Sequence, residues 1–155
     1  MDREQINTQK MLERSQIIAE FLDYFSGTED SLKDYGNGDL ISRTQVHVLS
    51  TIYEKPGLTA TELAAIKRRK KSTISQSLTI LEKKGYIYRV TDEKDAKKMR
   101  LHVTDEGAKL CNLHDAYDQK SMAERHWKLL QKCSEEEIQN FYKVMTAYNE
   151  VMKYE

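Results

Sequence analysis

The sequence KRRKKSTISQSLTILEKKGYI, residues 67 to 87, places five consecutive cations directly before a run of serine, threonine and glutamine. Within it Ile74, Leu78 and Leu81 recur at intervals of four and three residues, a spacing that predicts one buried helix face. The opposite face carries Ser72, Gln76, Thr79 and Lys83, with Thr73 and Ser75 at its margins. Gly85 follows two lysines and is the kind of residue that ends a helix. The segment therefore predicts an amphipathic helix whose exposed face can form hydrogen bonds.

Three helix starts along the chain share the capping-box pattern, in which Ser or Thr is followed three residues later by Glu or Gln. They lie at Ser42 to Gln45, Thr59 to Glu62 and Ser134 to Glu137. The second start predicts a short helix, Ala60 to about Lys67, that buries Leu63 and Ile66. Because a tight connection separates this helix from the amphipathic one, the pair predicts a helix-turn-helix.

After Gly85 the spacing of apolar residues changes from a helical pattern to alternation with polar residues. Residues 86 to 90 (YIYRV) and 99 to 103 (MRLHV) each alternate apolar and polar side chains, and the loop between them is charged. This pattern predicts an antiparallel β-hairpin with a long polar tip. A hairpin that follows a helix-turn-helix indicates a winged helix.

Long helices are predicted on both sides of the winged helix, at residues 5 to 25, 105 to about 131 and 135 to 153. The last has a coiled-coil-like seam of Ile138, Phe141, Met145, Tyr148 and Met152. Residues 27 to 39 contain three glycines and are interpreted as a connection. The fold class is therefore mainly α (α+β), with predicted boundaries at residues 1–35, 36–104 and 105–155.

The zero net charge of the chain conceals a strong asymmetry. Residues 67 to 100 contain 12 Lys or Arg and 4 acids, whereas the rest of the chain carries 13 Lys or Arg and 21 acids. A basic middle segment indicates an anionic partner. The chain shows no apolar run of the ~20 residues that span a membrane and no signal-peptide core at its start, so no membrane association and a cytoplasmic location are expected.

Four segments, ISRTQVHVL, PGLTATELA, STISQSLTILEKKGYIYR and DAKKMRLHVTDEG, together run from Ile41 to Gly107 and resemble the MarR family of bacterial transcription regulators. The resemblance implies a homodimer in which residues 1–35 and 105–155 dimerise and residues 36–104 bind double-stranded DNA. The chain departs from the family at the wing, where Asp95-Ala96-Lys97 replaces Asp-x-Arg. It also has Arg69 and Lys70 where the family usually has an apolar residue and a Ser N-cap, so the cap must come from elsewhere or the helix must start nearer Ser72.

The chemistry of the basic segment suits a duplex, because cations that neutralise phosphates release counterions. Gln76 can pair with adenine through two hydrogen bonds, and short Ser and Thr side chains can reach base edges or phosphates. Lys97 is expected to probe the minor groove less well than Arg, since its ammonium is strongly hydrated. The predicted DNA-binding residues are Arg68, Arg69, Lys70, Lys71, Ser72, Thr73, Ser75, Gln76, Thr79, Lys97 and Arg100.

We predict a ligand-responsive repressor that binds a pseudo-palindromic operator, with a small aromatic or acyl effector as the resemblance implies. Five tyrosines are expected on buried faces and could line its pocket, but they are interpreted chiefly as core: Tyr24, Tyr53, Tyr117, Tyr142 and Tyr148. The alternatives are a redox-sensing or metal-sensing regulator on the same scaffold, and a winged helix that binds protein or RNA.

The sequence offers little for these alternatives. Cys111 is expected to pack within a helix and Cys133 to precede the last cap, and His47, His102, His114 and His126 form no ligand spacing. No glycine-rich phosphate loop, HExxH motif or nucleophile–base arrangement is legible, so neither an enzyme nor a cofactor or metal is expected.

Overall fold

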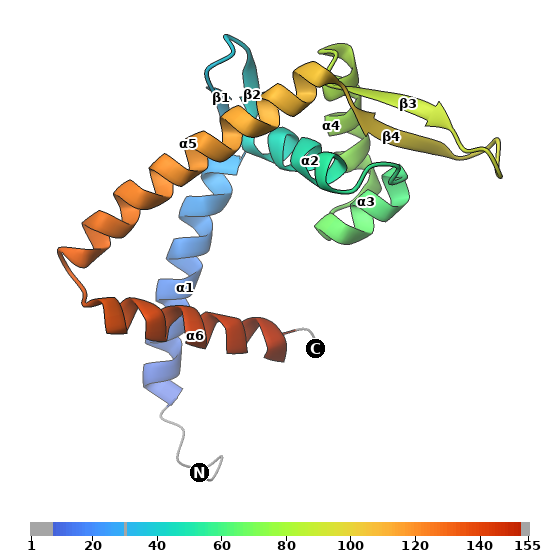
Figure 1. The fold of residues 1–155 in the computed structure, drawn as a ribbon. Helices are drawn as coiled ribbons and strands as arrows, with labels where there is room; N and C mark the ends of the chain where they lie inside the picture. The colour runs from blue at the N-terminus through green and yellow to red at the C-terminus, as the bar shows by residue number, and fades with distance from the viewer. Residues whose placement is uncertain (1–7, 30, 153–155) are drawn as a thin grey trace. The chain divides into compact units, whose positions relative to one another are not determined.

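The computed structural model describes residues 8–29 and 31–152. Its elements are α1 (Thr8–Glu29), β1 (Leu32–Asp34), β2 (Leu40–Ser42), α2 (Arg43–Glu54), α3 (Ala60–Lys67), α4 (Lys71–Lys83), β3 (Ile87–Thr91), β4 (Met99–Val103), α5 (Asp105–Leu130) and α6 (Glu135–Val151), as Figure 1 shows. They form two compact units that divide within α5, between His114 and Asp115. The mainly helical fold with a small antiparallel hairpin confirms the predicted fold class.

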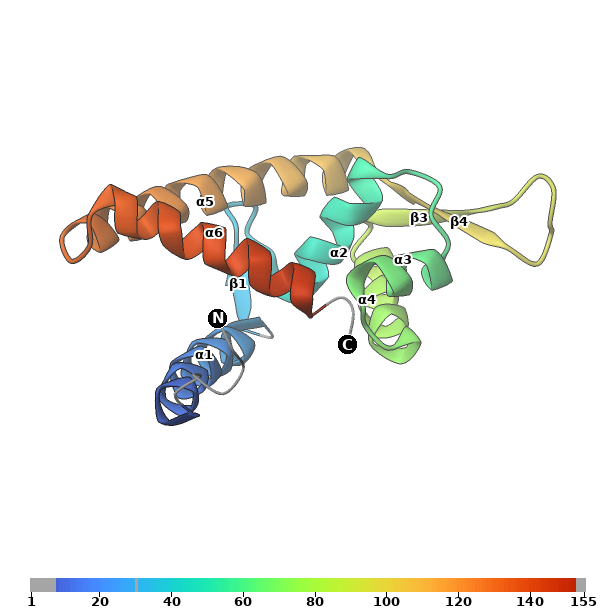
Figure 2. The same cartoon turned by 90° about the horizontal axis from the view of Figure 1, so that it is seen from below.

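The core of the first unit is aliphatic and joins α2, α3, α4, β4 and the start of α5. The three predicted core positions of α4, Ile74, Leu78 and Leu81, are at most 1% exposed. Other fully buried side chains are Ile41, Val46, Val48, Leu49, Ile52, Leu63, Leu101 and Leu110. Since each such side chain contributes about 1.5–3 kcal/mol on burial, this core holds α4 firmly against α2 and α3. Figure 2 shows these three helices grouped beside the β3–β4 hairpin.

All three predicted capping boxes are present. In each, the side chain of Ser42, Thr59 or Ser134 accepts from the backbone N–H three residues later, and the Gln or Glu there reaches back to the cap backbone. The end of α4 is also as predicted. Gly85 adopts φ +78°, and the N–H of Tyr86 donates to the carbonyl of Leu81 over 2.9 Å. These local signals therefore set where the helices begin and where α4 ends.

The wing is a regular antiparallel hairpin whose register pairs Ile87 with Val103 and Arg89 with Leu101. Its base is fastened to the segment after α2. The N–H of Leu101 donates to the carbonyl of Leu58, and the N–H of Gly57 donates to the carbonyl of Leu101, both over 2.9 Å. The turn that contains Pro56 thus supports strand β4.

The interpretation of residues 27–39 as a plain connection is wrong in two respects. Helix α1 continues to Glu29, and β1 and β2 form a second antiparallel pair. The loop between them is shaped by Asp34, whose Oδ1 accepts hydrogen bonds from the N–H groups of Gly36, Asn37 and Gly38. These hydrogen bonds lower the pKa of Asp34, and the bond from Gly36 has the largest effect. Strands of three residues are too short for an alternating pattern to be recognised, and the glycines suggested only a loop. The predicted start of α1 at Gln5 lies outside the described residues.

Several apolar side chains predicted to be buried are exposed in the single chain. Ile66 is 44% exposed, because it lies on the outer side of the short helix α3. The five tyrosines expected on buried faces are all at least 40% exposed. In the second unit the α6 seam buries Ile138, whereas Phe141, Tyr148 and Met152 are 50–60% exposed. The outer faces of the flanking helices thus carry large apolar side chains that this chain leaves in contact with solvent. Among the described helices, none is long and apolar enough to cross a bilayer.

Candidate nucleic-acid interface

The turn between α3 and α4 is built around Arg68. Arg68 caps α3 in the left-handed region, with φ 49° and ψ 41°, and its N–H donates to the carbonyls of Ala64 and Ala65. It is the only described non-glycine residue with positive φ. A side chain in this region costs about 1 kcal/mol relative to glycine. The turn therefore keeps a cation at a position where glycine would be more stable.

Helix α4 begins at Lys71, with Lys70 as its N-cap and without a side-chain hydrogen bond to that cap. Of the two possibilities left open by the sequence, the structure shows the second: the helix starts one residue before Ser72. Among the described residues, no side chain forms a capping hydrogen bond there. The first N–H groups of a helix lack intrahelical partners and favour an anion. Arg68, Lys70 and Lys71 are exposed around this end, and in the described part of the chain none of their side chains forms an ion pair.

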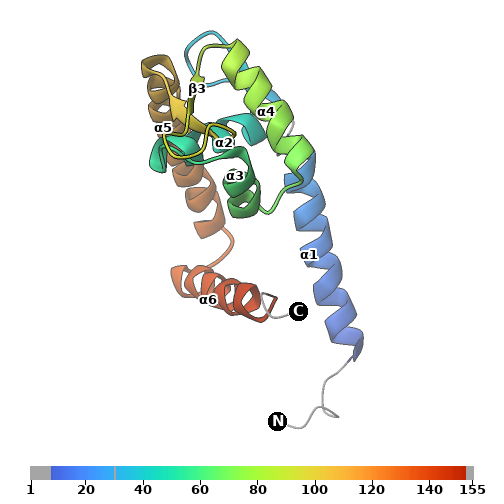
Figure 3. The same cartoon turned by 90° about the vertical axis from the view of Figure 1, so that its right-hand side faces the viewer.

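The outward face of α4 has the composition that the sequence predicted. Ser72, Ser75, Gln76 and Thr79 are exposed, and Thr73 is half-buried at the margin. The Thr79 hydroxyl donates to the carbonyl of Ser75 over 2.9 Å and so presents its lone pairs outward as acceptors. Figure 3 shows α4 with α3 below it, viewed from the side of the wing. The face can therefore present short donors and acceptors to a flat ligand such as a groove wall.

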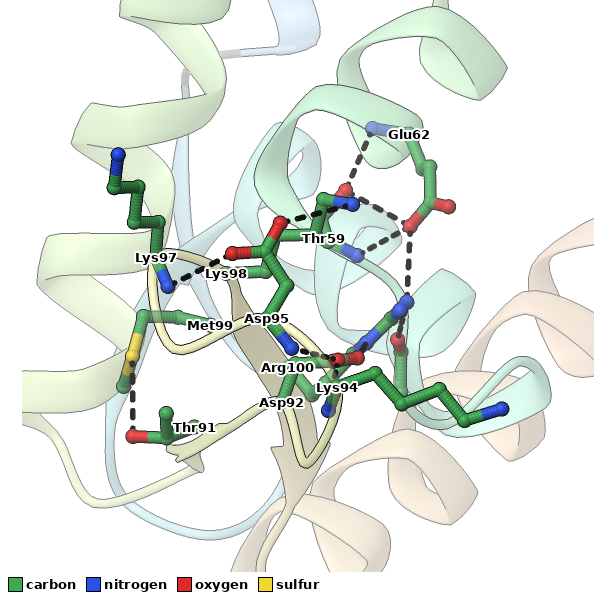
Figure 4. Close-up of polar contacts among 11 residues, drawn as sticks. Thr59, Glu62, Thr91, Asp92, Lys94, Asp95, Lys97, Lys98, Met99 and Arg100 are labelled. Atoms are coloured by element: carbon green, nitrogen blue, oxygen red, sulfur yellow. Dashed lines mark hydrogen bonds and ion pairs between the residues drawn. The ribbon is translucent and has the colours of Figure 1, made fainter.

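Arg100 lies inside the base of the wing, at the centre of an ion-pair network (Figure 4). Its Nε donates to Oδ2 of Asp92 over 2.6 Å, and its Nη1 donates to the carbonyl of Gly57 over 3.0 Å. Nη1 also lies 3.6 Å from Oε2 of Glu62. The hydrogen bond to Asp92 raises the pKa of Arg100 and lowers that of Asp92. The sequence predicted a DNA contact for Arg100, but the geometry gives its guanidinium a role in joining β4, the wing loop and α3.

The wing loop is ordered by two aspartates and presents lysines outward. Oδ1 of Asp92 accepts from the N–H groups of Lys94 and Asp95, and Oδ1 of Asp95 accepts from the N–H of Lys97. Among the described residues, Lys97 has an exposed side chain without an ion pair, and in Figure 4 it extends away from the Arg100 network. Lys98, in contrast, pairs with Asp95 over 3.2 Å. The ammonium of Lys97 is therefore exposed to solvent, and its role at the minor groove stays a prediction.

A hollow of about 180 Å³ lies beside this surface and was not predicted. We refer to it as the α2–α4 hollow. Its lining comprises Arg43, Thr44, His47, Val48, Lys67, Arg69 and Ile74. Arg69 had been predicted only as a DNA contact, and Arg43 and His47 had no assigned role. No sequence signal could have found the hollow, because α2 and the α3–α4 turn meet only in the folded chain.

Two histidines also meet in the first unit although their sequence spacing gave no sign of it. The rings of His47 and His114 are edge to face with centroids 5.2 Å apart, and Tyr35 packs on His114 at 5.1 Å. His114 and Cys111 are buried, the latter as predicted, within α5.

The MarR family pattern matches residues 41–99 of this chain. Two HTH-type transcriptional regulators of Bacillus subtilis (strain 168) are similar in sequence: YhjH is 29% identical over 105 residues and YybA 32% over 94 residues. These alignments cover 68% and 61% of this chain, and the chain spans 59% of the length of each relative.

Two solved structures resemble this chain in fold and sequence. FabT of Streptococcus pneumoniae, in complex with DNA, is 26% identical with a TM-score of 0.66, covering 95% of this chain and 98% of its own. MepR of S. aureus, in a DNA complex, is 25% identical with a TM-score of 0.68, covering 90% and 97%.

Proposed function

We propose that this chain is a winged helix-turn-helix transcriptional regulator of the MarR family, whose pattern matches residues 41–99, and that it binds double-stranded DNA as a homodimer and represses transcription in response to a small ligand. The observation that carries the proposal is the surface of α4: a face of Ser, Gln and Thr side chains that begins at an uncapped, cation-rich helix end. DNA complexes of FabT and MepR, which share this fold, support it.

In this proposal α4 enters the major groove. Gln76 forms two hydrogen bonds with an adenine edge, while Ser72, Ser75 and Thr79 contact bases or phosphates. Arg68, Lys70 and Lys71 neutralise backbone phosphates, so binding should weaken steeply as salt rises. Lys97 reaches the minor groove from the wing. Arg100 contributes indirectly, because it holds the wing loop that carries Lys97.

The homodimer is supported by the apolar faces of the flanking helices. Large exposed side chains include Phe21 and Leu22 on α1 and Trp127, Phe141 and Tyr148 on α5 and α6. Large apolar side chains exposed on each of these helices are typical of surfaces that contact another protein chain. Two-fold symmetry would place two copies of α4 in successive major grooves, about 34–36 Å apart, on a palindromic operator. Occupation of that operator in the cytoplasm would block transcription.

The ligand response requires a site that both senses an effector and influences α4. Aromatic side chains from the flanking helices could contribute in the dimer, and the small aromatic or acyl effector of the family resemblance fits such surroundings. The α2–α4 hollow is the described cavity that directly adjoins the turn before α4. An effector bound there would alter the surroundings of the recognition helix.

The decisive experiment is selection of fragments bound by the purified chain from a random duplex pool, followed by sequencing. We expect an enriched inverted repeat, bound at least a hundredfold more tightly than a scrambled duplex at 150 mM salt. Analytical ultracentrifugation should give a dimer. Equal affinity for every duplex, or a monomer at micromolar concentration, would favour instead a winged helix that binds protein or RNA.

Metal sensing is a second candidate, favoured by the contact between the imidazoles of His47 and His114. Imidazole nitrogens are common ligands of zinc. Elemental analysis of the purified chain, followed by zinc titration of the wild type and of His114→Asn, would test it. Stoichiometric zinc that is lost in the variant would support this reading, and equal weak binding by both proteins would exclude it.

A further inference from the structure

Helix α4 exposes one apolar side chain on a surface that is otherwise polar. The structure describes every residue of this helix, and eight of them are exposed. Seven of the eight are polar or charged, and the remaining one is Ile80, which is 37% exposed. The aliphatic side chains of Ile74, Leu78 and Leu81 are at most 1% exposed. Ile80 therefore does not belong to the core that holds α4 in place.

Ile80 lies on the same stripe of the helix as Gln76. At about 100° per residue, four positions bring a side chain back to within about 40° of its starting direction. Gln76 and Ile80 are thus neighbours one turn apart, separated by roughly 6 Å along the helix axis. Ser72, one turn before Gln76, and Thr79 are exposed on the same face. A groove wall that covers Gln76 therefore covers Ile80 as well.

The place of Ile80, and not its exposure, points to a function, because singly exposed apolar side chains are common on protein surfaces. In the major groove the base edges present hydrogen-bond donors and acceptors, and the C5-methyl group of thymine is the apolar group among them. A donor or acceptor pressed against Ile80 loses its water without gaining a partner, which weakens binding. A thymine methyl in the same position is itself removed from water, which strengthens binding.

We propose that Ile80 is a specificity-determining residue of the DNA-binding surface, and that it selects thymine by contact with the C5-methyl group. The inference rests on the proposed DNA-binding function and specifies one base of the operator. Stacked bases are about 3.4 Å apart along a strand. Since Ile80 and Gln76 are roughly 6 Å apart along the axis, the thymine lies within about two base pairs of the adenine that Gln76 recognises.

The backbone and the side chain both restrict where this apolar group lies. The carbonyl of Ile80 accepts the N–H of Lys84 over 3.0 Å, and the carbonyl of Leu81 accepts the N–H of Tyr86 over 2.9 Å. Ile80 is thus held in a closed helical turn although it is near the end of α4. A β-branched side chain in a helix also has one strongly preferred χ1 rotamer. A contact restricted in this way can distinguish a methyl group from a hydrogen atom.

Removal of a single methyl group from the DNA tests the contact. The operator obtained by selection is synthesised with uracil in place of one thymine at a time, which deletes only the C5-methyl group. Fluorescence anisotropy at 150 mM salt gives the dissociation constant of the full chain for each duplex. For the wild type we expect uracil at one position of a half-site to raise this constant about fourfold, the effect of burying one methyl group. In Ile80→Ala the same uracil should have no effect.

Two further variants separate a direct contact from a general loss of affinity. Ile80→Val keeps a β-branched apolar side chain and should retain part of the uracil effect. Lys83→Ala removes an exposed cation from the same stripe of α4 and is the matched control. It should weaken binding to all duplexes alike and keep the full fourfold effect of uracil. Circular dichroism should show the wild-type helix content in all three variants, because both side chains are exposed.

The outcomes distinguish the inference from the function on which it rests. A uracil effect of equal size in the wild type and in Ile80→Ala would assign the methyl contact to another side chain and overturn the inference. A selected operator that tolerates uracil at every position would overturn it too, while the DNA-binding function would stand. If no duplex is bound more tightly than a scrambled one, the proposed function fails, and the role of Ile80 fails with it.

Discussion

The phenol of Tyr86 donates a hydrogen bond of 2.8 Å to Oδ2 of Asp39, while Lys84 pairs with the other oxygen of the same carboxylate. Asn37 in turn donates to the Tyr86 hydroxyl over 2.9 Å. Asp39 and Asn37 lie in the β1–β2 loop, and Lys84 and Tyr86 flank the glycine that ends α4. The hydrogen bonds that Asp39 accepts from Lys84 and Tyr86 lower its pKa, and the bond from Lys84 has the larger effect. The loop thus holds the C-terminal end of the helix that we assign to the DNA groove.

The first prediction concerns the pH dependence of this anchor. The pKa of Tyr86 is raised from 10.0 to about 12. Burial is the main cause, and the hydrogen bond to Asp39 is the second. The native state therefore favours the protonated phenol, and this part of the stability is complete below pH 10 and is lost as the pH rises to about 12. Tyr86→Phe should cost about 0.5–1.5 kcal/mol at pH 8 and should remove this loss at high pH. Urea denaturation at pH 8, 10 and 11.5 measures both effects. Tyr88→Phe is the control and should retain the wild-type pH profile; identical profiles for all three proteins would rule out the anchor.

The second prediction is that Arg100 acts through the structure of the wing. Arg100→Gln leaves Asp92 and the Gly57 carbonyl without their guanidinium partner and should lower the melting temperature. Exchange of backbone hydrogens in residues 92–98 should become faster. Arg100→Lys should recover only part of the loss, because an ammonium cannot form the same fork of bonds. Wild-type exchange rates in Arg100→Gln would contradict this role.

The third prediction assigns direct contact to Lys97. Lys97→Ala should leave the melting temperature unchanged, lower operator affinity and reduce the slope of log K against log salt by about 1. Lys97→Arg should increase discrimination between operators with different minor-groove widths, because Arg is the better probe of that groove. Fluorescence anisotropy at four salt concentrations measures the slope. The assignment fails if Lys97→Ala binds like the wild type at every salt concentration.

The fourth prediction separates stability from DNA affinity at Arg68. Arg68→Gly relieves the left-handed backbone and should raise the free energy of unfolding by about 0.5–1 kcal/mol. The same change should weaken operator binding, since it removes a cation beside α4. Arg68→Ala is the comparison: it should lose the same affinity without the gain in stability. Equal melting temperatures for the Gly and Ala variants would show that the backbone carries no strain at this position.

The fifth prediction concerns the close approach of α5 to the start of the wing. A Cβ at Gly107 would lie 2.2 Å from the backbone oxygen of Tyr86 and 2.7 Å from Cγ1 of Val103. Because a backbone atom cannot move aside cheaply, Gly107→Ala should destabilise the chain by about 2 kcal/mol or more. Thermal unfolding measures the effect, with Lys109→Ala on the exposed face of the same helix as the control. A melting temperature within 1 °C of the wild type would contradict the clash, because 1 kcal/mol corresponds to about 2–4 °C for a chain of this length.

The amino-acid sequence by itself determined the winged helix, the ends of its helices and the polar face of α4. These features depend on signals that act within a few residues: the capping boxes at Ser42, Thr59 and Ser134, the glycine at position 85, and the period of the apolar side chains. Such signals act through hydrogen bonds and sterics along the local backbone, so they can be recognised without knowledge of the fold.

Only the tertiary structure decided how the charged residues are used. Lys67 and Arg69 line a hollow together with Arg43. Arg100 lies in the base of the wing. Asp39 accepts a hydrogen bond from Tyr86. Each of these contacts links residues that are distant along the chain. Their geometry follows from how the aliphatic core packs α2, α4 and β4 together, and no local pattern encodes that packing.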